Sequence, residues 1–392
     1  MFEGIVFALA SASLLAWIVL TLWHGSFWRI RFPRPCAEPR RWPTVVAIVP
    51  ARDEADVIDA TLEGLLQQEY PGAFHVILVD DHSTDGTASV AAAAAKKLSQ
   101  EARLTIVTAR DLPAGWVGKV WAQSEGLAVQ QQNFPEARYV LLTDADIGHD
   151  RQALRRLVAR AEAEQRVLTS LMVRLQCASP AEKALIPAFV FFFTMLYPFS
   201  RVNDPCSRVA AAAGGCMLAR VDTLMEIGGF AAIKDALIDD CALARHMKRH
   251  GPIRLDLAQD SYSLRSYGSW SGVWNMIARS AYTQLRYSPW LLAGTALGML
   301  LMYMVPPALT LGLTFTGSYP VWPALLAWLI MSVIYTPMLR YYRQSLLWAP
   351  ALPLVAMFYL GATVASAWRY WRGRGGQWKQ RSQAIRQPPY LR

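Results

Sequence analysis

Two aspartates one residue apart form the clearest chemical pattern in this sequence. Asp144 and Asp146 directly follow a short β-prone run at residues 139–143. In an extended segment, residues i and i+2 point to the same face, so both carboxylates leave one side of the chain. Hard carboxylate oxygens in that arrangement suit Mg²⁺ or Mn²⁺ shared with a substrate diphosphate. An Asp-rich turn between a strand and a helix would show the same spacing, so the pair alone leaves both interpretations open.

Acidic residues also follow two earlier β-prone runs. Asp53 and Glu54 come shortly after residues 44–49, and Asp80 and Asp81 come directly after residues 75–79. A pocket lined by these carboxylates would repel a diphosphate unless a divalent cation lay between them. The sequence has neither a G-x-G-x-x-G after a strand nor a complete P-loop, which argues against those two nucleotide-binding motifs.

The elements that must position these acids alternate between strand and helix. The pattern predicts strands near residues 44–49, 75–79, 104–107 and 139–143, and helices near residues 57–66, 83–98 and 120–131. Such alternation predicts an α/β fold with a doubly wound, mainly parallel sheet. Ligands bind beyond the carboxyl ends of the strands in these sheets, which is where the acids lie.

Composition places the rest of the chain in a membrane. Of the 392 residues 54% are hydrophobic and only 17% are charged, and the mean hydropathy is +0.20. About a quarter of an ordinary soluble domain is charged, so a simple soluble enzyme is excluded. Uncharged runs long enough to cross a bilayer lie near residues 4–24, 289–313, 320–338 and 346–367. Pro350 and Pro353 favour a re-entrant or interfacial shape for the last of these.

The basic residues flank the apolar runs. The net charge is +10, and five arginines follow the first run between residues 29 and 41. The positive-inside rule places that cluster in the cytoplasm. We therefore expect a retained transmembrane anchor at residues 1–28, a cytoplasmic domain with interfacial helices at 42–287, transmembrane helices at 288–368 and a basic tail at 369–392. Charges that flank lipid spans argue against nucleic-acid binding, and no protein partner is predicted.

The acidic segments resemble the family 2 glycosyltransferases, whose fold is of the GT-A type. Residues 79–87 (VDDHSTDGT) match the family's V-D-D-x-S-x-D-G-T segment, and residues 49–54 resemble its first nucleotide-contacting loop. Asp144-Ala145-Asp146 falls where the metal-binding D-x-D belongs. Residues 214–217 resemble the small-residue acceptor-side strand, and residues 238–243 resemble the segment that supplies the catalytic base.

The resemblance implies inverting transfer of a sugar from a nucleoside-diphosphate sugar, most simply a UDP-sugar. It implies Asp240 as the general base with Asp239 beside it, and Asp146 with Asp144 as ligands of Mg²⁺ or Mn²⁺. Implied contacts of the donor are Pro50, Arg52, Glu54, Asp80, Asp81, Lys119, Asp144 and Arg286. Implied acceptor-side residues are Gly214, Gly215 and Tyr287. For Lys119 and Arg286 the alternative is an ordinary surface cation, and for Asp239-Asp240 it is an acidic pair at a helix N-terminus.

The whole chain is more specifically similar to the bacterial glycosyltransferases associated with hopanoid biosynthesis, and more distantly to ceramide glucosyltransferases. Residues 111–119, 186–193 and 282–289 carry this similarity. It implies a membrane-lipid acceptor, a hopanoid or related polyisoprenoid, and a multi-pass protein of the bacterial cytoplasmic membrane. The apolar, aromatic stretch at 186–199 is either a surface-seated helix facing the bilayer or a buried core helix.

Two other functions compete with this interpretation. A processive polysaccharide synthase usually carries Q/R-x-x-R-W, whereas Thr283 replaces the Gln and Tyr287 replaces the Trp here. A non-catalytic membrane protein with a relict domain would be expected to lose the acidic set, which is complete. We therefore favour transfer to a lipid.

Overall fold

The computed structural model describes residues 2–314, 322–373, 377–378 and 381–382. The chain forms two compact units, each assembled from separate stretches. The helical unit comprises residues 1–31, 177–200 and 267–375, and the α/β unit comprises residues 32–176, 201–266 and 376–392. Most of the expected basic tail, and the start of the expected span at 320–338, lie outside the described residues.

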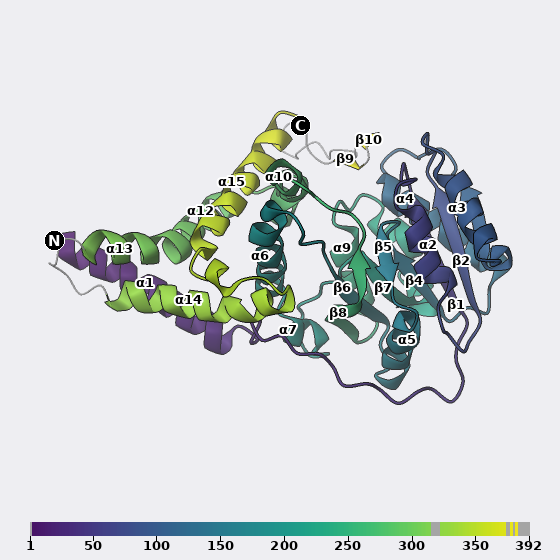
Figure 1. Cartoon of the computed structure of the whole chain (residues 1–392), viewed down its shortest axis with the longest axis horizontal. Coiled ribbons are helices and arrows are strands. Elements are labelled where there is room, and N and C mark those ends of the chain that lie inside the picture. The colour runs from purple at the N-terminus through teal and green to yellow at the C-terminus, as the bar shows by residue number, and fades with distance from the viewer. Residues whose placement is uncertain (1, 315–321, 374–376, 379–380, 383–392) are drawn as a thin grey trace. The chain divides into compact units, whose positions relative to one another are not determined.

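An eight-stranded sheet forms the centre of the α/β unit, in the order β3-β2-β1-β4-β7-β6-β8-β5 (Figure 1). The strands are β1 (Val45–Ala51), β2 (Phe74–Asp80), β3 (Leu104–Thr108), β4 (Tyr139–Thr143), β5 (Ile147–His149), β6 (Leu168–Arg174), β7 (Cys216–Arg220) and β8 (Ile253–Ser263). The first four strands pair in parallel, as β6 and β8 do, whereas β7 and β5 pair antiparallel with their neighbours. The predicted mainly parallel α/β sheet is confirmed.

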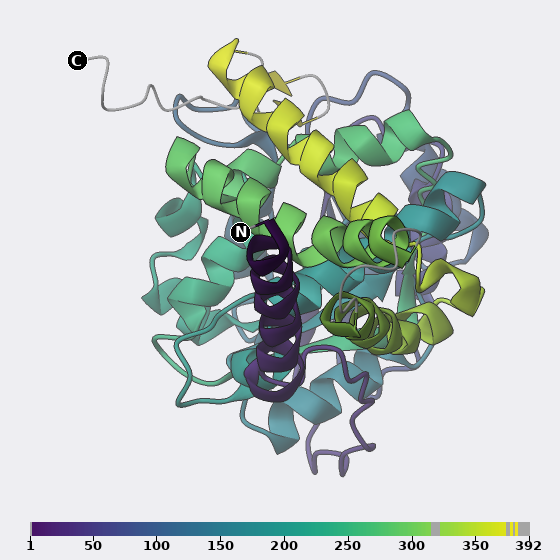
Figure 2. The ribbon, with the colours of Figure 1, turned by 90° about the vertical axis from the view of Figure 1, so that its left-hand side faces the viewer.

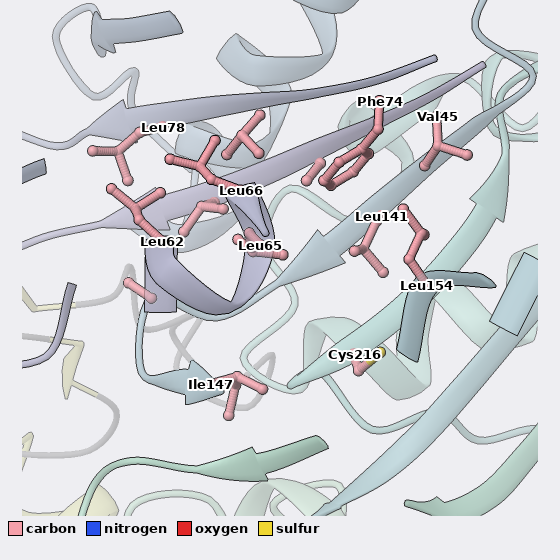
Figure 3. Close-up of a cluster of buried hydrophobic side chains, with 14 of the residues drawn as sticks. Val45, Leu62, Leu65, Leu66, Phe74, Leu78, Leu141, Ile147, Leu154 and Cys216 are labelled. Carbon is pink, nitrogen blue, oxygen red and sulfur yellow. The ribbon is translucent and has the colours of Figure 1, made fainter. Parts of the chain in front are cut away.

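The helices of this unit cover a core of β-branched and leucine side chains. They are α2 (Ile58–Leu66), α3 (Thr87–Lys97), α4 (Gly118–Asn133), α5 (Ala153–Ala163), α8 (Val221–Glu226) and α9 (Asp239–Met247). Every residue of β1 is buried, as expected for a central parallel strand covered on both faces. Figure 3 shows Leu62 and Leu65 of α2 packed among Leu78 and Leu141 from the sheet. This packing fixes the strand ends that carry the acids.

The helical unit contains only helices among its described secondary-structure elements, and several of them are long (Figure 2). They are α1 (Phe2–Trp23), α6 (Pro180–Leu196), α10 (Trp270–Ala278), α11 (Ala281–Gln284), α12 (Pro289–Met299), α13 (Val305–Thr314), α14 (Trp322–Tyr341) and α15 (Leu352–Trp371). In the sequence, the short helix α7 (Phe199–Asn203) includes the point after Ser200 where the chain passes from one unit to the other. Among the described residues, three segments are long and apolar enough to cross a membrane: Glu3–Trp23, Pro289–Gly312 and Trp322–Tyr341. Helix α15, which contains most of the fourth predicted segment, is not one of them.

A π-helical turn, Leu300–Met304, joins α12 to α13. Pro306 lacks the N–H that an α-helix would direct to the carbonyl of Met302 four residues earlier. The indole N–H of Trp17 in α1 donates to that carbonyl instead, over 2.9 Å. Trp17 is fully buried, and its ring meets Tyr303 edge to face at 5.2 Å. Helix α1 therefore satisfies a backbone group that the proline leaves without its usual donor.

The apolar stretch predicted at residues 186–199 falls mainly in α6, within the helical unit. Ile186, Val190 and Phe191 are fully buried, as the buried-helix alternative predicted, whereas Leu196 at the end of the helix is 55% exposed. The N-terminus of α6 is capped by Ser179 and Glu182, each accepting a backbone N–H of the other. This capping box fixes where the helix begins.

Candidate active site

Hydrogen bonds join the loops that follow β1 and β2. The register places Ala51 opposite Asp80, so both loops leave the sheet at the same level. Arg52 donates to the carbonyl of Asp81 over 2.5 Å, and Arg52 Nη1 lies 3.5 Å from Asp81 Oδ2. Asp81 is fully buried. The predicted donor-contacting residues of these loops, Pro50 through Glu54 and Asp80 with Asp81, are therefore adjacent in the structure.

The D-G-T end of the second loop, residues 85–87, holds the two loops together. Asp85 accepts the backbone N–H of Ala55 at 2.9 Å, and Thr87 accepts that of Glu54 at 2.9 Å. Asp53, in a left-handed conformation with φ of 50°, accepts the N–H of Thr84 at 2.8 Å. These side chains shape the loops, and Asp80 adds to them by accepting the N–H of Ser83 at 3.2 Å.

Each aspartate of the D-x-D pair lies against a cation. Lys119, in the first turn of α4, places its Nζ 2.6 Å from Asp144 Oδ1. Arg265, just after β8, donates from Nε to Asp146 Oδ2 over 2.8 Å. Its other end pairs directly with Glu54 of the first loop. The guanidinium thus connects the D-x-D segment to the loop after β1.

Sequence reasoning missed Arg265. Arg265 belongs to the segment Ser263-Leu264-Arg265-Ser266, which matches none of the motifs recognised in the sequence. The only available signal was its place at the end of a β-prone run. Burial would lower the pKa of Arg265, but its hydrogen bond to Asp146 and the charge of Glu54 raise that pKa, so the side chain is a permanent cation.

Lys119 also links the D-x-D pair to the predicted base. Its Nζ lies 3.5 Å from Asp239 Oδ2, a buried oxygen for which the described residues offer no hydrogen-bond partner. Burial would lower the pKa of Lys119, but the carboxylates of Asp144 and Asp239 raise it well above its usual value. For Asp144, burial raises the pKa, Lys119 opposes this and Asp146 adds to it. The positive charge of Lys119 therefore offsets the negative charge of carboxylates from two separate parts of the chain.

Asp240 lies at the start of α9, and two main-chain N–H groups orient its carboxylate. Its Oδ2 accepts the N–H of Gly214 at 2.9 Å, and its Oδ1 accepts the N–H of Cys241 at 2.6 Å. Burial and the neighbouring carboxylate of Asp239 raise the pKa of Asp240 to about 6, against the opposing charge of Lys119. A carboxylate with that pKa is ionised at neutral pH and is still a useful base.

Gly214 lies where the chain passes closest to both groups. A Cβ at this position would be 3.3 Å from Lys119 Nζ and 3.5 Å from Asp240 Oδ2. The neighbouring Gly215 would place its Cβ 3.0 Å from a methyl group of Val173. The predicted acceptor-side glycines therefore lie beside the predicted base, in a turn with little room for side chains.

The donor set suits a divalent cation. Asp144 Oδ1 pairs with Lys119 and Asp146 Oδ2 accepts from Arg265, and within the described part of the chain no hydrogen bond is found to the second oxygen of either aspartate. Two hard carboxylate oxygens, from residues separated by one position, fit Mg²⁺ or Mn²⁺. Such a cation usually takes one or two carboxylates and completes its coordination shell with water and phosphate oxygens. Among the described residues no group of three or more His, Cys, Asp or Glu side chains is arranged to hold a metal.

Two predicted site residues belong to the helical unit. Arg286 and Tyr287 follow α11, and both have left-handed backbones, with φ of 52° and 58°. The ring of Tyr287 stacks on Tyr370 at 4.4 Å. Their predicted roles at the donor and acceptor sites stay predictions.

The strand order and the helices of the α/β unit define a fold of the GT-A type. Residues 46–228 match the model of the family described as Glycosyl transferase family 2. This segment, just under half of the chain, is therefore similar to the family 2 glycosyltransferases. The matched range includes the D-x-D pair and Gly214 and ends before Asp240.

Solved structures are similar to this chain at low identity. One is the mannosyltransferase PcManGT from Pyrobaculum calidifontis in complex with GDP-Man and Mn²⁺, which is 20% identical with a TM-score of 0.60. The similarity covers 94% of this chain and 99% of that one, and it supports the GT-A fold. Another is the glucosyl-3-phosphoglycerate synthase of Mycobacterium tuberculosis with Mn²⁺ and UDP, 17% identical, with a TM-score of 0.42, over 62% of this chain and 79% of that one. No curated protein sequence matches the chain.

Proposed function

We propose that this protein transfers a sugar, with inversion, from a nucleoside-diphosphate sugar to a hydroxyl group of a membrane lipid. The observation that carries the proposal is the lysine bridge: Lys119 joins Asp144 of the D-x-D pair to Asp239, next to Asp240. A donor-side carboxylate and a base-side carboxylate thus share one cation, and an acceptor hydroxyl between them would be close to both.

The residues divide the chemistry between them. The loops at 50–54 and 80–81 bind the nucleoside, and an Asp side chain accepts from the base N–H. Asp144 and Asp146 hold Mg²⁺ or Mn²⁺, which supplies positive charge against the leaving diphosphate when bound. Asp240 takes the proton from the acceptor hydroxyl as that oxygen attacks the anomeric carbon. Attack opposite to the leaving group inverts the anomeric configuration.

A lipid acceptor and a membrane location are supported by the helical unit. Three of its helices are long and apolar enough to span a bilayer, and exposed aromatic side chains, such as Trp290 and Trp371, suit its interface. We propose the bacterial cytoplasmic membrane, with the α/β unit on the cytoplasmic side and a hopanoid or related polyisoprenoid as acceptor. A UDP-sugar is the proposed donor, and PcManGT, which is described with GDP-Man and Mn²⁺, makes GDP-sugars the necessary comparison.

The decisive experiment incubates the purified full-length protein with UDP- and GDP-sugars, Mn²⁺ or Mg²⁺, and extracted bacterial lipids, and identifies products by mass spectrometry. We expect one glycolipid, formed from one donor class and abolished by EDTA. A polymer would indicate a processive synthase. No product with any donor, together with no binding of UDP or GDP by calorimetry, would refute the proposal.

A further inference from the structure

A buried hydrogen-bond network centred on His149 lies inside the sheet of the α/β unit. His149 ends β5 and is 6% exposed, while its partners Thr143 and Ser261 are each 1% exposed. One ring nitrogen, Nε2, lies 2.9 Å from Thr143 Oγ1, and the other, Nδ1, lies 2.8 Å from Ser261 Oγ. None of these groups has a part in the transfer chemistry described above.

The partners determine which nitrogen carries the proton. Thr143 has one hydroxyl hydrogen, and it is donated to the carbonyl of Gly215 at 2.8 Å. The oxygen of Thr143 must then accept from His149, so Nε2 carries the hydrogen. The Nδ1 atom is left as an acceptor and receives the hydroxyl hydrogen of Ser261. Burial lowers the pKa of His149 to about 4, so the ring stays neutral at physiological pH.

A further member of the network lies at the start of β7. Cys216, the residue after Gly215, is hydrogen-bonded through its side chain to Ser261, and burial raises its pKa to about 12. The register of the sheet places Thr143 opposite Cys216, and His149 opposite Ser261. Hydrogen bonds of side chains therefore reinforce backbone pairing across four strands, β4, β5, β7 and β8.

Both ends of the network adjoin the candidate site. Thr143 directly precedes Asp144, which Lys119 contacts. Gly215 directly follows Gly214, whose N–H orients Asp240. The hydroxyl of Thr143 accepts from His149 and donates to Gly215. It thus connects the segment that holds the donor-side carboxylate to the turn that holds the base, and His149 fixes the orientation of that hydroxyl.

We propose that His149 is a positioning residue that sets the distance between the D-x-D segment and the Asp240 turn. This inference deepens the proposed function and rests on it. A buried polar network holds one geometry only when every member is satisfied, and the neutral, Nε2-protonated ring satisfies all of them. The donor loops and the D-x-D pair retain their own contacts through Arg52 and Arg265. Loss of the ring is therefore expected to misplace the base without removing the donor site.

The test compares three variants of the full-length protein. His149→Leu removes both ring hydrogen bonds, and its kcat is expected to fall about ten- to a hundredfold, the cost of a misplacement of about 1 Å. Calorimetric binding of UDP with Mn²⁺ should be unchanged. His149→Gln can donate to Thr143 and accept from Ser261, so it is expected to restore kcat. His75→Leu is the matched control, because His75 bonds Thr105 at 2.8 Å on the edge of the same sheet, at the end of β2 away from Asp80.

A spectroscopic readout separates this inference from the proposed function. In ¹⁵N NMR of imidazole-labelled protein, His149 should show the neutral, Nε2-protonated form from pH 5 to 9, and Thr143→Val should shift its Nε2 signal. If this signature is present but no sugar is transferred by any protein, the proposed function fails and the network stands. If His149→Leu folds and keeps the wild-type kcat, or if His75→Leu loses as much, the positioning role is wrong. Should His149→Leu not fold, Ser261→Ala takes its place. For that variant we likewise expect kcat to fall while the binding of UDP with Mn²⁺ stays unchanged.

Discussion

The backbone N–H of Gly214 donates a 2.9 Å hydrogen bond to Oδ2 of Asp240. Together with the N–H of Cys241 on the other oxygen, it fixes the plane of the carboxylate. A base held in this way needs no rearrangement before it accepts a proton. Replacement of the carboxylate by an amide keeps only one of these two hydrogen bonds, because an amide has a single acceptor oxygen.

Asp240→Asn tests the base directly. The amide cannot accept a proton, so we expect transfer to fall by about 10²–10⁴-fold, the usual contribution of a general base. Binding of UDP with Mn²⁺, measured by calorimetry, should stay close to wild type. Transfer at the wild-type rate would show that another group is the base.

The raised pKa of Asp240 predicts how activity depends on pH. Below about 6 the carboxyl is protonated and cannot accept the hydroxyl proton, so kcat/KM should fall with the ionised fraction. The folded protein also binds this proton more tightly than the unfolded chain does. Its free energy of unfolding, measured against that of Asp240→Asn, should therefore increase as the pH is lowered through 6. A flat kcat/KM profile between pH 7 and 5 would contradict the assignment.

Lys119→Met removes the cation shared by the two halves of the site. Lys119 lowers the pKa of Asp240, so the acidic limb of the pH–rate profile should move above 6. Three carboxylates would be left near one another without their counter-charge, so the melting temperature should also fall at pH 8. Lys97→Met, at an exposed position late in α3, is the control and should change neither quantity.

Asp146→Asn tests the metal ligand without an activity assay. We expect Mn²⁺ binding in the presence of UDP, followed by electron paramagnetic resonance, to weaken at least about tenfold, because a hard anionic ligand is lost. Asp222→Asn, which breaks an exposed pair with Arg220 at the far end of β7, removes the same charge elsewhere. Equal Mn²⁺ affinity in both variants would place the cation away from the D-x-D pair.

Trp17→Phe tests the contact between α1 and the π-helical turn. Removing the indole N–H leaves the carbonyl of Met302 without its donor, which should cost about 1 kcal/mol of stability in detergent or lipid. Trp290, which is 86% exposed, gives the control variant Trp290→Phe. If both variants unfold at the same denaturant concentration as wild type, the indole bond contributes nothing.

Much of the α/β unit could be predicted from the sequence because its signals are local. The predicted strand at residues 139–143 coincides with β4, and the other predicted strands differ from β1, β2 and β3 by one or two residues at their ends. Buried β-branched runs separated by helical patterns leave little freedom in assigning such elements. The motif of residues 79–87 placed Asp80 and Asp81 at a strand end for the same reason.

The ion pairs of the site could not be predicted, because they depend on contacts across long stretches of chain. Arg265 reaches Asp146 from 119 residues away in a segment that has no motif. The resemblance implies Lys119 as a contact of the donor, and the sequence gives no sign of its ion pairs with Asp144 and Asp239. The role of Thr143 and His149 was equally hidden, since a strand pattern records which residues are buried and does not reveal which polar groups meet.

The helical unit interrupts the α/β unit in sequence, because α6 lies between β6 and β7. During synthesis, six strands of the sheet leave the ribosome before α6, and the strands that hold Gly214 and Arg265 in place follow it. A fragment trimmed only at its two ends therefore cannot yield the complete sheet free of this apolar helix. Expression of the catalytic half in water would require α6 to be excised and its flanks joined.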